Sequence, residues 1–174
     1  IVSNNHVLAD SNNANIGDAI YSLDNSAQKI GVLDNYLPIY SPGENRLDLA
    51  VAQLQGFDSP TPRGSAGYRT PSIGEKVYKY GATTGKTEGI VRSLHYTSKI
   101  KYGNSSAVFV DQIQITSNRT GYSFSEGGDS GSIIKSSYDD ALVGLLFAGN
   151  GNWTLANHQT LVVDQLKKWG YNVK

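Results

Sequence analysis

Short apolar runs, each broken within a few residues by Gly, Asn or Ser, recur along this chain of 174 residues. Strands bounded by turn residues produce such a pattern, whereas amphipathic helices need longer stretches with a period of 3.6 residues. Only TLVVDQLKKWG, which starts at Thr160, has helical spacing, and it closes with two lysines and a glycine as helix ends commonly do. The sequence therefore predicts an all-β barrel or sandwich with a C-terminal helix. The runs are AIYSL, KIGVL, LAVAQL, KVYKYG, GIVRSL, AVFVDQIQI, GSIIKS and ALVGLLFAG.

The chain is long enough for one large domain or for two small barrels that share an interface. The segment from Gly56 to Gly74 contains three of the five prolines and little apolar pattern. We interpret it as the crossing between two halves, residues 1–65 and residues 66–174.

Charge and cysteine usage exclude several classes of function. Lys plus Arg and Asp plus Glu both number 15, no basic run occurs, and no apolar stretch approaches the ~20 residues of a membrane span, so neither nucleic acid nor a membrane is an expected partner. GATTGKT is not a phosphate-binding loop, because Gly81 and Gly85 enclose three residues where that motif has four. The absence of cysteine excludes disulfides and thiolate metal sites and leaves the redox compartment undetermined. A protein or peptide substrate is the remaining expectation.

The stretch EGGDSGS, from Glu126 to Ser132, contains a candidate nucleophile at Ser130. Taken alone it is ambiguous, because Gly, Asp and Ser also gather in turns for reasons of backbone geometry. A serine hydroxyl is a poor nucleophile at neutral pH and needs a neighbouring base, usually His, with a third group that orients the base. The functional interpretation therefore requires a histidine and a carboxylate elsewhere in the chain.

Three histidines are present, and His6 is the strongest candidate for the base. It lies in IVSNNHVLAD, which reads as a strand end, a turn that bears the His, and a short buried segment. His95 lies in an ordinary alternating strand pattern and His158 directly precedes the helical pattern. For the carboxylate, Asp48 precedes the apolar run LAVA, where an acid must be hydrogen-bonded to be tolerated. A structural His and a carboxylate at a strand edge remain the alternatives for these two residues.

The stretches NNHVLA, DLAVAQL and GGDSGS occur in the order His, Asp, Ser, and together they resemble the trypsin-like (chymotrypsin-fold) serine peptidases. The resemblance is to the disulfide-free bacterial branch of that family. YGATTGKTEGIV, from Tyr80 to Val91, is similar to the hairpin at the start of the second barrel, and VGLLFAGNG, from Val143 to Gly151, to the strand that borders the substrate pocket. The resemblance implies two six-stranded β-barrels with the active site in the cleft between them.

The resemblance also implies a role for each matching residue. Ser130 would attack the carbonyl carbon, His6 would accept and return the proton, and Asp48 would fix the imidazole tautomer. The backbone N–H groups of Gly128 and Ser130 would form the oxyanion hole, the site that binds the negatively charged oxygen of the intermediate. It implies neither a cofactor nor a metal.

The substrate pocket follows from the same resemblance. Its floor would come from Phe124 and its wall from Phe147, Ala148 and Gly149. No acid stands at the expected floor and no basic or His cluster accompanies it, so we expect a preference for an apolar or small side chain.

The first barrel is expected to lack its N-terminal strands, because only five residues precede His6 and they reach at most about 18 Å. We therefore expect an upstream segment or a partner chain to complete that barrel. In trypsin-like peptidases an Ile-Val terminus pairs with the Asp that precedes the nucleophile, here Asp129, but so short a segment could not hold His6 at the site while it carried Ile1 there. The resemblance implies a secreted bacterial protein.

Three classes of function are consistent with these motifs to different degrees. A serine endopeptidase uses all of them, and a catalytically silent trypsin-fold module for binding or regulation is the alternative. An esterase with a Gly-x-Ser-x-Gly elbow is disfavoured, because position 132 is Ser.

Overall fold

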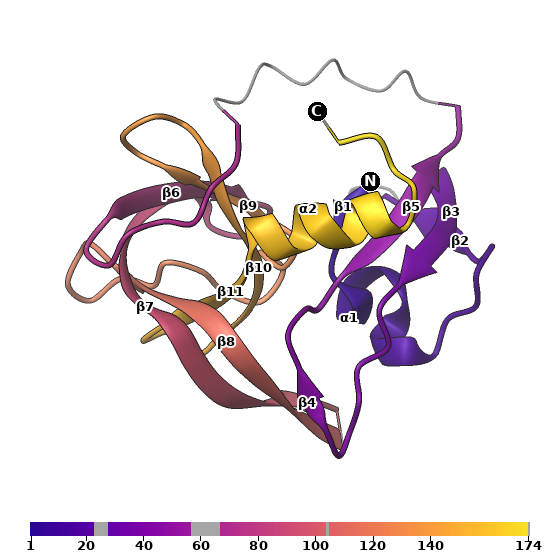
Figure 1. Cartoon of the computed structure of the whole chain (residues 1–174), viewed down its shortest axis with the longest axis horizontal. Helices are drawn as coiled ribbons and strands as arrows, with labels where there is room; N and C mark the ends of the chain where they lie inside the picture. The colour runs from indigo at the N-terminus through magenta and orange to yellow at the C-terminus, as the bar shows by residue number, and fades with distance from the viewer. Residues whose placement is uncertain (23–27, 57–66, 104, 174) are drawn as a thin grey trace.

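The computed structural model describes residues 1–22, 28–56, 67–103 and 105–173. Within these residues the chain is mostly β, and it forms two sheets joined by a helix that lies between them (Figure 1). The boundary expected between residues 65 and 66 lies outside the described residues, so the two domain ranges stay a prediction. No helix among the described residues has the length and apolar character needed to cross a membrane.

The first half is a four-stranded antiparallel sheet with the order β1-β5-β3-β2. One α-helical turn, α1 (Asn5–Leu8), and one 3₁₀ turn, η1 (Asp10–Asn12), follow its first strand. Leu8, Ala9 and Leu33 form part of the small core against which α1 packs. The strands are β1 (Val2–Ser3), β2 (Ala19–Tyr21), β3 (Lys29–Tyr36) and β5 (Ala50–Leu54).

In the part of the chain that the structure describes the first sheet is open, which is consistent with an incomplete first barrel. Strands β1 and β2 are its edges, and each pairs with one neighbour among the described residues. A sheet edge presents unpaired N–H and C=O groups that another strand can bind. The segment or partner chain expected to complete this sheet stays a prediction.

The second half is a closed barrel, because the β11–β8 and β6–β9 pairings join strands that are distant in sequence. Six strands close it in the order β6-β7-β8-β11-β10-β9, and the short β4 (Glu44–Asn45) adds to β8 in parallel. Its interior holds fully buried aliphatic side chains such as Val77, Ile113 and Ile134. The barrel strands are β6 (Lys76–Gly81), β7 (Gly85–Tyr102), β8 (Ser105–Ser117), β9 (Ile133–Ser136), β10 (Leu142–Gly149) and β11 (Thr154–His158).

Among the described residues, the β7–β8 hairpin and helix α2 (Gln159–Lys168) both connect the halves. The long β7–β8 hairpin extends out of the barrel and meets β4 at the lower end of the molecule in Figure 1, where Ser41 Oγ donates to Ser106 O at 2.6 Å. Helix α2 begins one residue before the predicted start. Its buried Val162 and Leu166 pack against residues of both sheets, Val51 in the first and Leu145 in the second. The hairpin and the helix therefore join the two halves on different faces.

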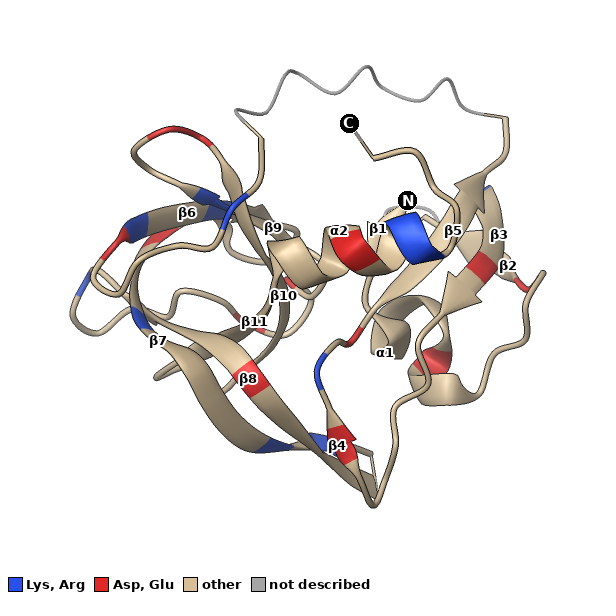
Figure 2. Ribbon diagram, viewed as in Figure 1, with Lys and Arg blue, Asp and Glu red and all other residues tan. Residues whose placement is uncertain are grey.

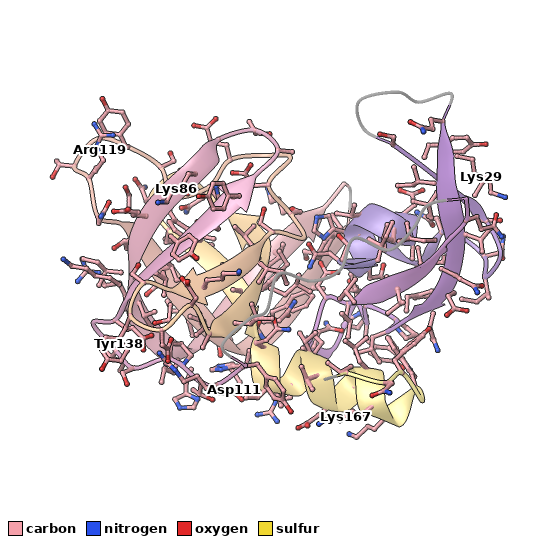
Figure 3. The ribbon with its side chains drawn as sticks, turned by 90° about the horizontal axis from the view of Figure 1, so that it is seen from above. Lys29, Lys86, Asp111, Arg119, Tyr138 and Lys167 are labelled. Atoms are coloured by element: carbon pink, nitrogen blue, oxygen red, sulfur yellow. The ribbon has the colours of Figure 1, made fainter. Side chains whose placement is uncertain are left out.

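The polar surface has no dominant sign of charge. In the view of Figure 2 acidic and basic residues are spread over both halves, as the balanced sequence composition predicts. Figure 3 shows the molecule from above, with Lys29 on the outer side of the first sheet, Arg119 at the far end of the barrel and Lys167 on α2. The distribution of charge therefore does not mark a functional site on this surface.

Candidate active site

His6 is held at the boundary between the two halves by the turn that follows β1. Two residues at the start of α1 anchor this turn, because Asn4 Nδ2 donates to Asp48 O at 3.0 Å and Asn5 Nδ2 donates to Leu37 O at 2.6 Å. The apolar strand followed by a polar turn that the sequence predicts is thus present. The His6 side chain is 22% exposed, so it is fixed at its base and open at its tip.

Asp48 is completely buried and faces His6. Its Oδ2 lies 2.6 Å from His6 Nδ1 and its Oδ1 accepts from the backbone N–H of His6 at 3.2 Å. A further donor is the Tyr102 hydroxyl, 3.0 Å from Oδ2, whose ring also lies 5.7 Å from the His6 ring. Burial, with the Asp48 carboxylate beside it, raises the pKa of the Tyr102 phenol, which therefore stays protonated as a donor. These donors satisfy the buried carboxylate, which can therefore orient the imidazole.

The backbone of Asp48 is clamped by the opposite half of the molecule. Asn157 on β11 donates through Nδ2 to Asp48 O at 3.1 Å and accepts from Asp48 N at the same distance through Oδ1. Both groups of Asn157 are buried, so the pair is shielded from water. The second barrel thus fixes a side chain contributed by the first half.

Ser130 lies in the turn before β9, on the other side of the same cleft. Among the described residues neither Ser130 Oγ nor His6 Nε2 has a hydrogen-bond partner, and both residues line the cleft. The backbone N–H groups of Gly128 and Ser130 also have no acceptor within the described residues. Those of Asp129 and Gly131, in contrast, donate to Glu126 O at 3.1 Å and to Leu146 O at 2.9 Å. Within the described residues the turn therefore leaves without an acceptor the two N–H groups for which the resemblance implies the role of an oxyanion hole.

The fully buried side chain of Asp129 stabilises this turn, because its Oδ2 accepts from the backbone N–H of Glu126 at 3.1 Å. Burial disfavours its charge, but hydrogen bonds from Thr84, Glu126 and Thr83 outweigh that effect and lower the pKa of Asp129 to about 2. Lys79 Nζ, also fully buried, lies 3.2 Å from Asp129 Oδ2. The stability that this carboxylate contributes is therefore present above its ordinary pKa of 3.8 and lost as the pH falls through about 2.

The cation that contacts Asp129 is the ammonium group of Lys79 and not the N-terminal amine. The N-terminal nitrogen of Ile1 donates instead to Ala52 O at 2.7 Å within the first sheet. This confirms the expectation that Ile1 does not reach Asp129.

Replacing Lys79 with Met is expected to lower the free energy of unfolding by about 3 to 5 kcal/mol, because removing one partner leaves the buried Asp129 carboxylate unpaired. Urea unfolding followed by tryptophan fluorescence measures this loss. Lys76→Met is the matched control, since Lys76 is exposed on the same strand, and its expected cost is below about 0.5 kcal/mol. Equal stability of the two variants would show that the ion pair does not support the turn.

His6 and Ser130 line a cleft of about 440 Å³ that lies between the two halves. Phe147, Ala148 and Gly149 line this cleft, and the tip of the β7–β8 hairpin closes one side of it with Ile100, Lys101 and Tyr102. The assignment of Phe147, Ala148 and Gly149 to a substrate pocket stays a prediction. The remaining lining residues include Ser125, Glu126 and Gly127 from the segment before Ser130. A cleft of this size can accept one large side chain together with some main chain.

Phe124 is not at the floor of this cleft, which corrects the expectation. Its side chain is 2% exposed and packs in the core of the barrel with Ile115 and Val77. Burial of a phenyl ring stabilises the fold by about 2 kcal/mol or more, so the ring turns inward. Its neighbour Ser125 lines the cleft instead and hydrogen-bonds Thr154 at 2.6 Å between the two hydroxyls.

The other two histidines lie away from the cleft. His95 contacts the carboxylate of Asp111 and its side chain is 81% exposed. His158 hydrogen-bonds Leu94 O at 2.8 Å through Nε2. Neither histidine lines the cleft that contains Ser130, whereas His6 does.

No family model matches the sequence, and no curated protein matches it. Solved structures do match. A glutamic acid specific serine protease that utilises a novel histidine triad in substrate binding superposes with a TM-score of 0.65 at 18% identity, covering 99% of this chain and 85% of that chain. Thermobifida fusca protease A gives a TM-score of 0.64 at 20% identity, covering 97% of this chain and 81% of that chain. The chain has the chymotrypsin fold.

The chymotrypsin fold extends over nearly the whole chain. Cellulomonas bogoriensis chymotrypsin matches it with a TM-score of 0.61 at 18% identity, covering 97% of this chain and 82% of that chain. The resemblance stated from the motifs is thus confirmed for the fold, and the absence of cysteine is consistent with a disulfide-free type.

Four residues that support the site were not predicted from the sequence. Lys79 had a visible signal, because it stands two residues after Val77 on β6 and so faces the barrel interior. Tyr102, Asn157 and Thr83 had none, because each reaches its partner through a contact that local patterns do not encode.

Proposed function

We propose that this protein is a serine endopeptidase that hydrolyses peptide bonds through an acyl-enzyme intermediate. The observation that carries the proposal is that one cleft is lined both by His6, whose Nδ1 contacts buried Asp48, and by Ser130. Within the described residues the Ser130 hydroxyl and the backbone N–H groups of Gly128 and Ser130 have no hydrogen-bond partner. Each of these groups has a defined task in acyl transfer. The chymotrypsin fold and its serine protease neighbours support the same reaction.

The reaction begins with attack of Ser130 Oγ on the carbonyl carbon, while His6 Nε2 takes the hydroxyl proton. The C–O bond that forms shifts one electron pair onto the carbonyl oxygen, which the N–H groups of Gly128 and Ser130 bind. His6 then gives its proton to the leaving amine as the C–N bond breaks, and the acyl group stays on Ser130. Water, activated by His6 in the same way, releases the acid and restores the hydroxyl.

Asp48 contributes by holding the proton of His6 on Nδ1 and by stabilising the imidazolium that forms. Its 2.6 Å contact to Nδ1 and its complete burial favour this task. The Tyr102 hydroxyl and the His6 backbone N–H keep the carboxylate in place.

The substrate is a protein or peptide, and an apolar or small side chain is the preferred one beside the cleaved bond. Leu146, Phe147 and Ala148 provide apolar lining, and Ser125 adds one hydroxyl to it. Glu126 is the one acidic side chain among the described residues that line this cleft. Lys101 lines the same cleft and carries the opposite charge. A preference for Arg or Lys is therefore disfavoured.

A peptide library tests the activity and the preference together. We expect the wild-type protein to cleave internal peptide bonds with apolar or small residues before the cut, and His6→Gln to lose cleavage. His95→Gln is the matched control, because that histidine is exposed and outside the cleft, and it should cleave as the wild type does.

Two outcomes would contradict the proposal in different ways. Strong selection for Arg or Lys would show that the pocket assignment is wrong while the reaction stands. Absence of cleavage, with peptides bound equally by wild type and His6→Gln, would instead support the catalytically silent binding module.

A further inference from the structure

The peptide group between Gly127 and Gly128 decides whether one donor of the oxyanion hole faces the cleft. A trans peptide is planar, so its C=O and its N–H point in opposite directions. The carbonyl of Gly127 accepts a hydrogen bond from Thr83 Oγ1 at 2.7 Å. Its direction toward Thr83 therefore sets the N–H of Gly128 in the opposite direction.

Little else among the described residues holds this peptide. Glycine stands on both sides of it, and a Cβ added at Gly127 would meet nothing within 4 Å. Glycine tolerates many backbone angles, and Gly128 already has φ of +97°. Rotation of the peptide would place the Gly127 carbonyl where the Gly128 N–H now stands and would remove a donor.

Thr83 is itself well placed to prevent that rotation. Its backbone N–H donates to Asp129 Oδ1 at 2.9 Å, and Asp129 is the carboxylate paired with buried Lys79. Thr83 Oγ1 also lies so close that a Cβ added at Gly128 would come within 2.3 Å of it. Thr83, in the hairpin that follows β6, thus contacts the turn at the carbonyl of this peptide and again at Asp129.

We infer that Thr83 is a positioning residue that keeps the oxyanion hole formed, by holding the Gly127 carbonyl through its hydroxyl. The inference rests on the proposed function, since it assigns the two N–H groups to a reaction intermediate. Thr83 does not touch the substrate in this assignment and acts through the Gly127–Gly128 peptide.

Kinetics of three variants test the inference. Thr83→Val keeps the shape and removes the hydroxyl. We expect kcat to fall about tenfold, which is about 1.4 kcal/mol, with KM within twofold, because a hydrogen bond is lost and the donor acts mainly in the transition state. Thr83→Ser restores the hydroxyl and should recover most of kcat. Thr87→Val is the matched control, since Thr87 Oγ1 donates to another carbonyl of the same segment, Phe124 O, at 2.7 Å, and its kcat should stay within twofold.

A labelling experiment and a pair of crystal structures separate this inference from the proposed function. Failure of a fluorophosphonate to label Ser130 in the wild type would overturn the proposed function alone. Crystal structures of wild type and Thr83→Val then decide the inference, which predicts a rotated or disordered Gly127–Gly128 peptide in the variant. An unchanged peptide with wild-type kcat or labelling rate in Thr83→Val, or equal losses in Thr83→Val and Thr87→Val, would overturn it.

Discussion

Ser130→Ala is expected to lower kcat for peptide hydrolysis by about a millionfold, by analogy with removal of the serine from other such triads. The Ser130 hydroxyl has no hydrogen-bond partner among the described residues, so its removal leaves no buried group unpaired. The midpoint of thermal unfolding should therefore match that of the wild type. Turnover of a chromogenic peptide, measured with circular dichroism melting on the same sample, checks both expectations.

Ser132→Ala provides the comparison for this variant. Ser132 lies in the same turn, but its hydroxyl donates to Asp129 O at 2.6 Å and does not line the cleft. We expect a loss of at most several-fold. A severe loss in Ser132→Ala together with near-normal turnover in Ser130→Ala would show that the nucleophile is misassigned.

Asp48→Asn is expected to lower kcat by about 10⁴-fold while it preserves the geometry of the site. The amide can keep the place of the carboxylate, but its NH₂ or its uncharged oxygen next to Nδ1 no longer stabilises the correct tautomer and the imidazolium. Steady-state kinetics at neutral pH measure the loss, and a crystal structure confirms that His6 has not moved.

Tyr102→Phe gives a graded comparison with Asp48→Asn. It removes one donor 3.0 Å from Asp48 Oδ2 and leaves the charge and the His6 contacts in place. The expected loss is about tenfold, because one hydrogen bond to a charged group is worth about 1.5 kcal/mol. Near-normal activity in Asp48→Asn would contradict the role of Asp48. A 10⁴-fold loss in Tyr102→Phe would contradict the expectation that Tyr102 contributes less to catalysis than Asp48.

The fold could be predicted in outline because its signals are local. Strands such as β5 and β10 coincide with the runs LAVAQL and ALVGLLFAG, and the helical spacing after Thr160 became α2. The β11–β8 pairing that closes the second barrel could not be predicted from the sequence, since no local pattern specifies which distant strands pair.

Candidate site residues could be proposed from the sequence where residue type carries the chemistry. His6, Asp48 and Ser130 each stand in a short motif. The structure pairs His6 with Asp48 and places His6 and Ser130 in the lining of one cleft. The supporting contacts could not be predicted, because Asn157 reaches Asp48 across 109 positions and Tyr102 reaches it across 54. The error at Phe124 has the same origin, because an alignment of positions does not say which way a ring turns.

The most direct test of the account is the mass of the protein after reaction with a phosphonofluoridate. The folded protein should gain one phosphonyl group, located on Ser130 by peptide sequencing, and neither the Ser130→Ala variant nor the urea-unfolded protein should gain it. Folded wild-type protein without an adduct, or with the adduct on another residue, would contradict the assignment of Ser130 as an activated nucleophile.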